Sequence, residues 1–356
     1  MRLFQNNGLS RGFRTHRPLA SNRSFGECLR SFLDTRYTAS HILLPVFSGD
    51  ADAFYTNGDD ETLQGLWARD NGLAGKSLEQ ILLAQIEHHR TEVFYNLDPM
   101  RYGSAFVRQL PGCVKKSVGW RAAPSGSADL SGYDLVVCNF PSILEGWQAR
   151  GCRVAYFSPA HDPAMDSYAA GRREQIDLLF VGGFSRHHRA RVAALTAAAS
   201  VPGIRARFHL EDSRLTRLAN LLPFLPLTAE LRHPAKIRRL RAGPLYGRDL
   251  YAAMASSRIV LNGAVDMAGE DRGNMRCFEA VGCGAVLLTD AGRYPEGFVE
   301  GETMVTYASA DDIPHLIERL IADEEWAAAI AAAGNAMVRD RYSKQRQWDR
   351  FQELCG

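Results

Sequence analysis

From Ser40 onward, short apolar runs rich in β-branched residues alternate with longer amphipathic runs, and this alternation most constrains the fold. Such alternation is typical of parallel sheets covered by helices. In the first half, five runs predict strands: His41 to Phe47, Glu92 to Asn96, Lys115 to Trp120, Tyr133 to Asn139 and Arg153 to Ser158. The amphipathic stretches Ser77 to Arg90 and Ser142 to Arg150 predict helices between them.

A second series starts at Ile176, where IDLLFVGG predicts a strand that ends at a glycine pair, and a helix follows over His187 to Ala199. Four later runs predict strands: Ile204 to Leu210, Arg258 to Asn262, Ala285 to Thr289 and Met304 to Tyr307. Helices are expected over Asp249 to Ser256, Asn274 to Gly282, Asp311 to Ala322 and, at the end of the chain, Ala327 to Leu354.

The two series predict an α/β protein of two Rossmann-like, doubly wound domains whose sheet edges face a central cleft, with a C-terminal helix. The polar segment Met165 to Glu174 marks the expected boundary. We therefore divide the chain into a basic extension (1–37), an N-terminal domain (38–170), a C-terminal domain (171–340) and a terminal helix (341–356). The basic, proline-punctuated stretch Leu221 to Arg241 is expected to be irregular.

Charge and cysteine content exclude several classes of protein. The net charge of +2 is too small for a non-specific nucleic-acid binder. Seven scattered cysteines without a CxxC pair argue against a disulfide framework or a zinc site and favour a cytoplasmic location. No apolar stretch has the roughly 20 residues that a spanning helix needs. The first 37 residues hold seven arginines against two acids, which allows at most a peripheral membrane contact.

The strongest local motif is DRGNMRCFEAVGCGAVLLTD, residues 271–290. Asp271 and Glu279 are eight positions apart, about 80° around a helix, so one acid is expected before the helix and the other on it. Glu279 is suited to accept hydrogen bonds from two ribose hydroxyls, and the loop from Asp271 to Asn274 to reach the sugar and the diphosphate, which makes Asp271 a catalytic candidate. Gly284 would allow a close backbone approach. For Asp271 the alternative is a helix N-cap, and for Glu279 a solvated helix glutamate.

This stretch resembles the donor signature of GT-B glycosyltransferases in which two acids are separated by seven residues, and RCFEAVGCGAVLLTD is similar to the CgeB-like branch, related to spore-maturation glycosyltransferases. The resemblance covers Ile176 to about Tyr342. It implies a donor-binding C-terminal domain, an acceptor-side N-terminal domain, no metal, and retention of anomeric configuration. Asp271 replaces the glutamate of the wider family, which puts its sugar contact in doubt.

Other residues are expected to hold the donor. Arg272 and Arg276 could neutralise diphosphate. Gly182 and Gly183, at the predicted strand end, and the basic residues Arg186 and Arg189 are expected to cradle phosphate, or else to form an ordinary tight turn. Adjacent His187 and His188 point apart, so they predict no metal site. Tyr246 and Gly247 are expected near the base and Asn262 at a strand end, with ordinary core positions as the alternative.

In the first half, polar residues follow predicted strands, where doubly wound domains bind ligands. They are Asn96, Asp98, Arg121, Asn139, His161 and Asp162. His161 is the first candidate for a catalytic or donor-orienting group, because histidine titrates near neutral pH, and Asp98 is the alternative base. A structural histidine is the alternative for His161.

Together these features predict transfer of a sugar from an NDP-sugar, with UDP the expected nucleotide, to a glycan, protein or small-molecule acceptor. No cofactor is expected beyond this co-substrate. Three alternatives stay open: an NDP-sugar epimerase of the same fold, a non-enzymatic nucleotide-binding protein, and a nicotinamide-dependent dehydrogenase. The last is disfavoured because no GxGxxG opens either half.

Overall fold

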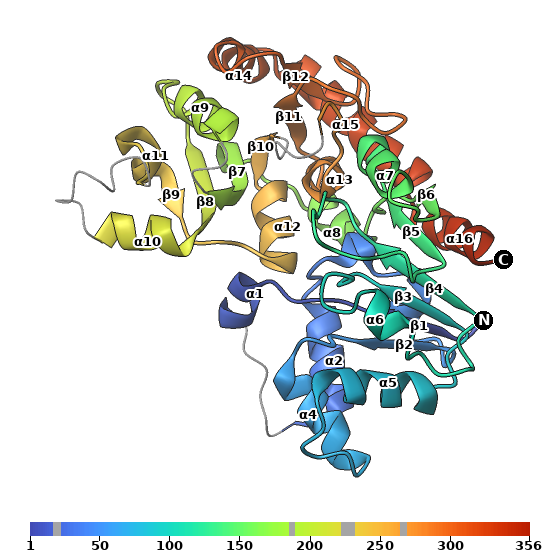
Figure 1. Ribbon diagram of the computed structural model, residues 1–356. Coiled ribbons are helices and arrows are strands. Elements are labelled where there is room, and N and C mark those ends of the chain that lie inside the picture. The colour runs from blue at the N-terminus through green and yellow to red at the C-terminus, as the bar shows by residue number, and fades with distance from the viewer. Residues whose placement is uncertain (17–22, 185–188, 222–231, 264–268) are drawn as a thin grey trace. The chain divides into compact units, whose positions relative to one another are not determined.

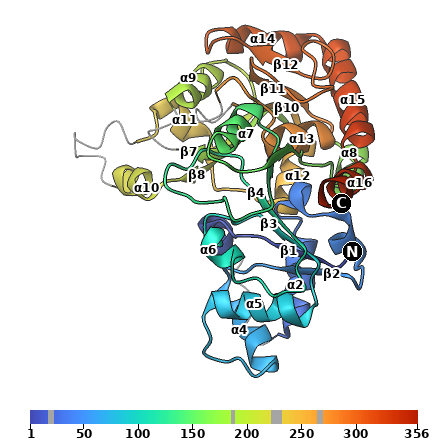
Figure 2. The ribbon, with the colours of Figure 1, turned by 45° about the vertical axis from the view of Figure 1, so that its right-hand side comes forward.

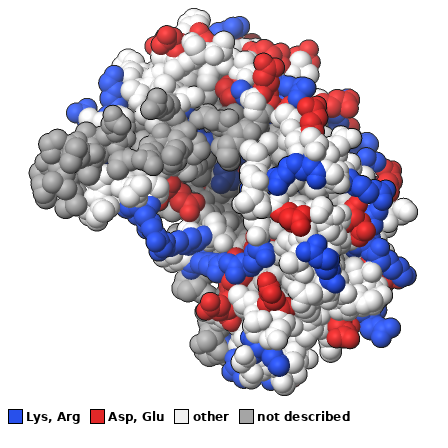
Figure 3. All heavy atoms as spheres, in the orientation of Figure 1, with Lys and Arg blue, Asp and Glu red and all other residues white. Residues whose placement is uncertain are grey.

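The computed structural model describes residues 1–16, 23–184, 189–221, 232–263 and 269–356. The chain divides into two compact units (Figure 1). The first unit comprises Met1–Pro159 and Lys344–Gly356, and the second comprises Ala160–Ser343. Lys and Arg are interspersed with Asp and Glu over the face shown in Figure 3, as expected for a chain whose net charge is +2.

The first unit contains a six-stranded parallel sheet in the order β2-β1-β3-β4-β5-β6. Its strands are β1 (Leu3–Asn6), β2 (Ala53–Thr56), β3 (Val93–Asn96), β4 (Lys116–Trp120), β5 (Leu135–Cys138) and β6 (Val154–Tyr156). Its helices are α1 (Arg11–His16), α2 (Phe25–Asp34), α3 (Leu44–Ser48), α4 (Glu61–Asp70), α5 (Leu78–His88), α6 (Ser104–Val107), α7 (Pro141–Gln148) and α16 (Lys344–Cys355). The chain reverses its direction across the sheet between β1 and β3, which makes this pair the topological switch point.

The second unit contains another six-stranded parallel sheet, in the order β12-β11-β10-β7-β8-β9. Its strands are β7 (Ile176–Phe184), β8 (Ala206–Asp212), β9 (Arg241–Ala242), β10 (Ser257–Leu261), β11 (Val286–Asp290) and β12 (Val305–Tyr307). Counted along the chain this is the 3-2-1-4-5-6 order of the dinucleotide-binding fold, with its switch point between β7 and β10.

Helices cover both faces of the second sheet (Figure 2). They are α8 (Ala164–Ala170), α9 (Arg189–Ala198), α10 (Arg214–Leu221), α11 (Ala235–Leu240), α12 (Gly247–Ala255), α13 (Met275–Gly282), α14 (Asp312–Ala322) and α15 (Glu324–Arg341). Leu195 of α9 and Ile317 of α14 pack in one apolar core, and Met254 of α12 and Phe278 of α13 in the other. The fold class expected from the sequence, two doubly wound Rossmann-like α/β domains and a C-terminal helix, is therefore confirmed.

Two expectations about the first unit are wrong. Residues 1–37 are not an extension, because Leu3–Asn6 form β1 and pair with both β2 and β3. The run from His41 to Phe47 is not a strand: a 3₁₀ turn at Ala39–His41 is followed by α3, which has a proline in its first turn. Proline fits the first turn of a helix and cannot donate to a sheet ladder.

The domain limits also differ from the expected ones. The first unit ends at Pro159 rather than near residue 170, since α8 packs with α12 and α13 in the second unit. The chain returns to the first unit at Lys344, whose buried Nζ donates to the carbonyl oxygens of Ala39 and Ile42 at 2.6 and 2.7 Å. The terminal helix is thus part of the first unit.

Candidate functional site

The candidate site lies at the carboxyl ends of β10 and β11 and the start of α13 in the second unit. In open parallel sheets, ligands bind at this edge, near the switch point. The structure brings together here six of the thirteen residues predicted at the donor site. We call this group the α13 cluster: Asn262, Asp271, Arg272, Asn274, Arg276 and Glu279.

Helix α13 begins at Met275 because the Asn274 side chain caps it, with Oδ1 accepting from the Arg276 amide at 3.0 Å. Asp271 lies before the helix and Glu279 on it, as the spacing predicted. The cap is Asn274, so the N-cap alternative for Asp271 is wrong. The amides of the first turn face the start of the helix, where they favour an anion.

The Glu279 carboxylate is 2% exposed, so the alternative of a solvated helix glutamate is wrong. It accepts a charge-assisted hydrogen bond from Arg276. Burial raises the pKa of Glu279, and the Arg276 guanidinium opposes that rise. A buried carboxylate with a single strong donor keeps acceptor capacity for further hydrogen bonds, such as those from vicinal hydroxyls.

Asp271 is held by an arginine that the sequence analysis missed. Arg293 donates from Nε to Asp271 Oδ1 at 2.6 Å, and a parallel β-bridge joins the two residues. The Asp271 side chain is fully buried. This carboxylate therefore fixes the loop before α13. Asp271 and Arg293 are 22 positions apart, on either side of α13 and β11, so no periodic pattern in the sequence predicts their contact.

The two predicted diphosphate-binding arginines are both paired with carboxylates. Arg276 holds Glu279, and Arg272 Nε lies 2.6 Å from Asp290 Oδ2 at the end of β11. Arg272 also donates from Nη1 to the Gly269 carbonyl oxygen at 2.8 Å. The cluster is therefore a set of partly buried ion pairs, in which an incoming anion would share guanidinium groups that are already fixed in place.

Asn262 links the ends of neighbouring strands. Its Nδ2 donates to Thr289 Oγ1 at 3.2 Å, and its Oδ1 accepts from Asn274 Nδ2 at 3.3 Å. Its carbonyl oxygen accepts from the Tyr307 hydroxyl at 2.9 Å. Asn262 thus follows a strand end, as expected, and connects β10, β11 and β12 to the cap of α13.

The glycines of the motif serve α13 itself. Gly284 has φ +79° and follows the helix cap Cys283, and the bonds from Gly284 N to Val281 O and from Ala285 N to Ala280 O form a Schellman motif. A Cβ on Gly282 would lie 2.5 Å from Met165 Sδ and 2.9 Å from His161 Nδ1. The expected close approach of a ligand at Gly284 is therefore replaced by a helix-capping role.

The predicted phosphate turn differs from the structure. Strand β7 does not end at Gly182 and Gly183; it continues to Phe184, and the pair is in register with Leu210 and Glu211 of β8. Arg186 lies outside the described residues, as do His187 and His188, and Arg189 begins α9. The phosphate role of this turn stays a prediction.

Arg191, which the sequence analysis did not select, lies at the switch point. It donates from Nη1 to the Gly183 carbonyl oxygen at 2.8 Å and from Nη2 to that of Gly263 at 3.3 Å. It thus bridges the carboxyl ends of β7 and β10. The signal available in the sequence was its place in the first turn of a helix that follows the first strand of a doubly wound series.

Tyr246 and Gly247 mark the start of α12. Tyr246 occupies the N-cap position and is largely buried, and Gly247 opens the helix with φ +54°. The left-handed backbone conformation explains the glycine. Their expected position near a base stays a prediction.

His161 belongs to the second unit and lies against α13. Its ring is 3% exposed, its Nε2 lies 2.9 Å from Asp166 Oδ1, and its Nδ1 faces Gly282. Burial lowers the pKa of His161, and the hydrogen bond with Asp166 opposes the shift. The next residue, Asp162, is fully buried and accepts from the Tyr251 hydroxyl at 3.3 Å.

Asp98, the alternative base, belongs to the first unit. It lines a cavity of about 660 Å³ at the β1/β3 switch point, together with Gly8, Asp59, Arg14 and Arg101. Arg101 Nε lies 3.5 Å from the Asp98 carboxylate, and burial raises the pKa of Asp98. Asp59, which the sequence analysis missed, accepts from the Leu9 amide and from Arg14. Asp98 and His161 thus lie in different units.

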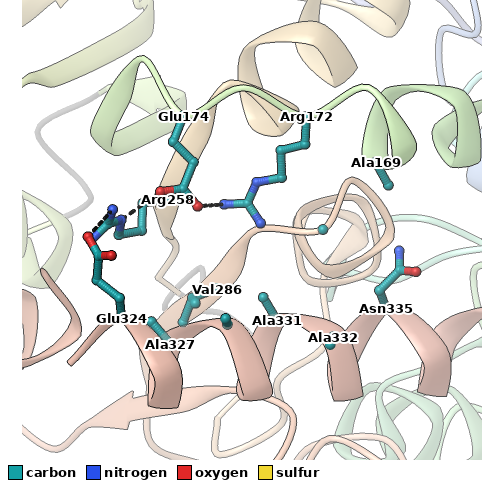
Figure 4. Close-up of a pocket in the computed structure, with 12 residues that line it drawn as sticks. Ala169, Arg172, Glu174, Arg258, Val286, Glu324, Ala327, Ala331, Ala332 and Asn335 are labelled. Carbon is teal, nitrogen blue, oxygen red and sulfur yellow. Dashed lines mark hydrogen bonds and ion pairs between the residues drawn. The ribbon is translucent and has the colours of Figure 1, made fainter.

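A second cavity, of about 400 Å³, lies at the amino ends of the strands of the second sheet, opposite the α13 cluster (Figure 4). Arg172 and Arg258 both bind Glu174, above a row of alanines from α15. It is lined by the first residues of β10 and β11 and contains Gly284 alone of the predicted site residues. It is therefore separate from the α13 cluster.

Within the described ranges, no three His, Cys, Asp or Glu side chains are grouped so as to hold a metal ion. The same part of the chain contains no helix with the length and apolar character needed to cross a membrane.

Comparison with solved structures defines the class of fold. The chain is similar over 99% of its length to HepE of Anabaena in complex with UDP and glucose, over 99% of that chain, with 13% identity and a TM-score of 0.61. It is similar to a glycosyltransferase of Rickettsia africae over 99% of this chain and 97% of that one, with 10% identity and a TM-score of 0.54. Sucrose-phosphate synthase of Thermosynechococcus elongatus matches with 12% identity and a TM-score of 0.52, over 85% and 79% of the two chains. The chain has the two-domain α/β fold known as GT-B.

The sequence comparisons match a smaller part of the chain than the structural ones. The family model described as "Glycosyl transferase-like" matches residues 188–353, which is 166 of the 356 positions. It contains the whole α13 cluster. No curated protein matches the sequence. The closer resemblance to the CgeB-like branch and to its paired-acid motif stays a prediction.

Proposed function

We propose that the protein is a glycosyltransferase that takes a sugar from a nucleoside diphosphate sugar, with UDP as the nucleotide, bound by its second unit. The observation that carries the proposal is the buried Glu279 carboxylate beside Arg276, on a helix whose capped N-terminus lies at a strand edge suited to anions. The family match over residues 188–353 supports it.

In this proposal each group has a defined task. Glu279 accepts hydrogen bonds from the two ribose hydroxyls, while Arg272, Arg276 and the first-turn amides of α13 neutralise the diphosphate. The bond between the anomeric carbon and the diphosphate oxygen breaks, and its electron pair stays on the diphosphate. The acceptor hydroxyl oxygen forms the new bond and loses its proton. Preorganised donors stabilise the charge that develops on the leaving group.

The finer features are proposals of the same kind. Guanidinium groups and helix amides supply positive charge at the diphosphate, so we propose that transfer needs no metal. We propose retention of configuration from the resemblance described above. The acceptor, a glycan, a protein or a small molecule, is assigned to the first unit, with Asp98 as the candidate base in its cavity. His161 is assigned a positioning role, because it packs on α13. The seven free cysteines accord with a cytoplasmic location.

The first prediction concerns the ribose contact. Glu279→Ala should weaken binding of a UDP-sugar about a hundredfold, because two hydrogen bonds to a charged acceptor are lost. The affinity of Glu279→Gln should lie between those of Glu279→Ala and the wild type. Calorimetric titration measures the affinity, and circular dichroism checks the fold. Glu318→Ala on α14, away from the α13 cluster, is the matched control. Unchanged affinity in folded Glu279→Ala would refute the assignment.

The second prediction concerns the metal. Transfer to an acceptor preparation, followed by release of UDP, should persist in excess chelator, because the arginines and helix amides already hold the leaving group. Loss of activity that Mg²⁺ or Mn²⁺ restores would contradict the metal-free mechanism. The same assay without acceptor distinguishes the alternatives, since conversion of the donor to its epimer would identify an epimerase.

A further inference from the structure

Helix α10 packs with its apolar side chains directed outward. It buries the small residues Thr216 and Ala219 and exposes Leu215, Leu218 and Leu221. Their exposed fractions of 52%, 54% and 75% are the highest of any large apolar side chain in the described part of the chain. Single exposed leucines are common, but three on one face of one helix form a patch that usually marks a contact surface.

Basic residues surround these leucines. Arg214 and Arg217 lie on the same exposed face of α10, and Arg238 and Arg239 are exposed on α11. Among the described residues none of these four arginines forms an ion pair. Positions 214–241 hold seven Lys and Arg residues against a single acid, a net charge of +6 in a chain whose total is +2. The rest of the chain therefore sums to −4, so this short region carries a local excess of positive charge.

The two helices have a rigid base at the edge of the second sheet, where they lie beside β8 and β9 (Figure 1). His233 Nε2, just before α11, lies 2.8 Å from Asp212 Oδ1 at the end of β8, and Arg241 donates to the other oxygen of Asp212 at 2.7 Å. Ile237 of α11 is fully buried. The leucines and arginines are thus held outward by an ordered support, and residues 222–231, which join the helices, lie outside the described residues.

We propose that α10 and α11 dock the protein on the surface of a membrane that contains anionic lipids. An amphipathic helix with leucines and arginines on one exposed face lies in the interface, with its leucines at the boundary of headgroups and acyl chains. Arginine stems extend along the apolar layer while their guanidinium groups bind lipid phosphates. A nucleic acid would use the charge and leave the leucines exposed, and a second copy of this basic patch would repel the first.

This surface differs from the one that the sequence suggested. The basic residues of positions 1–37 indicated a peripheral contact at the N-terminus, yet Leu3–Asn6 form a strand inside the first sheet. The proposal does not depend on the α13 cluster. Neither α10 nor α11 contributes a residue to it.

Sedimentation of the full chain with vesicles tests the proposal. The protein should bind vesicles of phosphatidylcholine and phosphatidylglycerol and remain in solution with phosphatidylcholine alone, and binding should weaken as salt rises. Replacing the four arginines (Arg214→Gln, Arg217→Gln, Arg238→Gln, Arg239→Gln) should lower the partition coefficient on the order of a thousandfold. Replacing the three leucines (Leu215→Ser, Leu218→Ser, Leu221→Ser) should lower it at least about tenfold.

Matched controls isolate the surface. Val299→Ser removes an exposed apolar side chain elsewhere in the second unit, and Arg69→Gln with Arg153→Gln removes exposed arginines of the first unit; both should bind vesicles like the wild type. The proposal is overturned if the wild type does not bind anionic vesicles, or if the controls lose as much binding as the patch variants. It is also overturned if the leucine variant converts a dimer into a monomer without changing vesicle binding.

Discussion

Each unit has a topological switch point in its sheet, and different side chains connect the strands at the two switch points. In the first unit the ends of β1 and β3 are joined by neutral groups: Asn6 Nδ2 donates to Asn96 Oδ1 at 2.9 Å, and Asn96 Nδ2 donates to the Tyr133 hydroxyl at 2.6 Å. The Tyr102 hydroxyl donates to the Gly58 carbonyl oxygen at 2.6 Å. In the second unit Arg191 bridges β7 and β10, and the α13 cluster consists of arginine–carboxylate pairs.

The difference teaches where a charged ligand fits. A neutral network of amides and phenols is stable only when every member is satisfied, and the charged groups of the first unit, Asp98 with Arg101 and Asp59 with Arg14, line the cavity beside it. The ion pairs of the second unit hold guanidinium groups in place, and an incoming phosphate could share these groups with their carboxylate partners. The arginines at the carboxyl ends of the second sheet support the proposal that the second unit binds the diphosphate, and the carboxylates of Asp59 and Asp98 in the cavity of the first unit support its proposed role at an acceptor hydroxyl.

The largest effect is expected at Asn96, in the neutral hydrogen-bond network of the first unit. Asn96→Leu should lower the free energy of unfolding of the first unit by about 4 kcal/mol, because it removes four hydrogen bonds and leaves buried partners unsatisfied. Donor affinity should not change. In a Trp326→Phe background all remaining tryptophans lie in the first unit, so fluorescence during urea unfolding reports that unit alone.

The control for this prediction is Asn71→Leu, at an exposed position where the side chain makes one hydrogen bond, to the Trp67 carbonyl oxygen. It should cost at most about 1 kcal/mol. Equal losses in the two variants would show that the network around Asn96 is not cooperative.

Acid should affect the first unit more than the second. Burial lowers the pKa of His41 in the first unit to about 3, and burial also lowers the pKa of His89, where Arg2 adds to the shift and Asp52 opposes it. In the second unit burial lowers the pKa of His161, and Asp166 opposes the shift. Because unfolded histidine has a pKa of about 6.5, the unfolded state binds more protons below that pH, and stability falls as pH decreases from 7 to 5. The slope from His89 should reach at most about 1.4 kcal/mol per pH unit.

Urea unfolding in the same Trp326→Phe background at pH 7, 6 and 5 measures this slope. His89→Gln should reduce the slope, leaving the part that His41 contributes, and His315→Gln, exposed on α14 in the second unit, should not change it. An identical slope in His89→Gln and the wild type would contradict the contribution of His89.

The smallest effect concerns the backbone that orients α13. Gly284→Ala should cost about 1 kcal/mol of stability through its positive φ alone, since a Cβ there meets no atom closer than 3.6 Å. Gly301→Ala has a similar φ of +75° and open space around it, so it should cost the same. Thermal unfolding gives both values. Only Gly284→Ala should also weaken donor binding. Equal donor affinity in the two variants would show that the capping motif of α13 does not affect the donor site.

Residues with local signals were predictable. The strands β3, β4, β5, β10 and β11 are apolar runs bounded by turn residues, and the position of Glu279 on a helix followed from its spacing. By contrast β1 has only four residues, LFQN, two of them polar, and its burial depends on pairing with strands 50 and 90 positions away. Proline in α3 was outweighed by its apolar neighbours in the sequence analysis, which therefore expected a strand.

In the candidate site, too, residues with local signals were predicted and residues with distant partners were missed. Cap and helix residues such as Asn274 and Glu279 were found because their roles are set by nearby residues. Arg293 and Arg191 were missed because their partners are distant in sequence or are backbone carbonyl groups, which any residue could supply. Gly284 was predicted to allow close approach of a ligand, whereas the structure gives it a role in capping α13. A glycine with a left-handed backbone after a helix and a glycine beside a ligand give the same pattern in a sequence.

The return of α16 to the first unit has a consequence for biogenesis. The Lys344 ammonium group, enclosed by carbonyl oxygens of residues 39 and 42, joins the first unit only after the intervening 184 residues, Ala160–Ser343, have been synthesised. On the ribosome the first unit has all six strands of its sheet once Tyr156 has been synthesised, but it lacks the packing of α16 until the second unit has been made. A nascent chain halted before residue 344 would hold a finished second unit behind an unfinished first one.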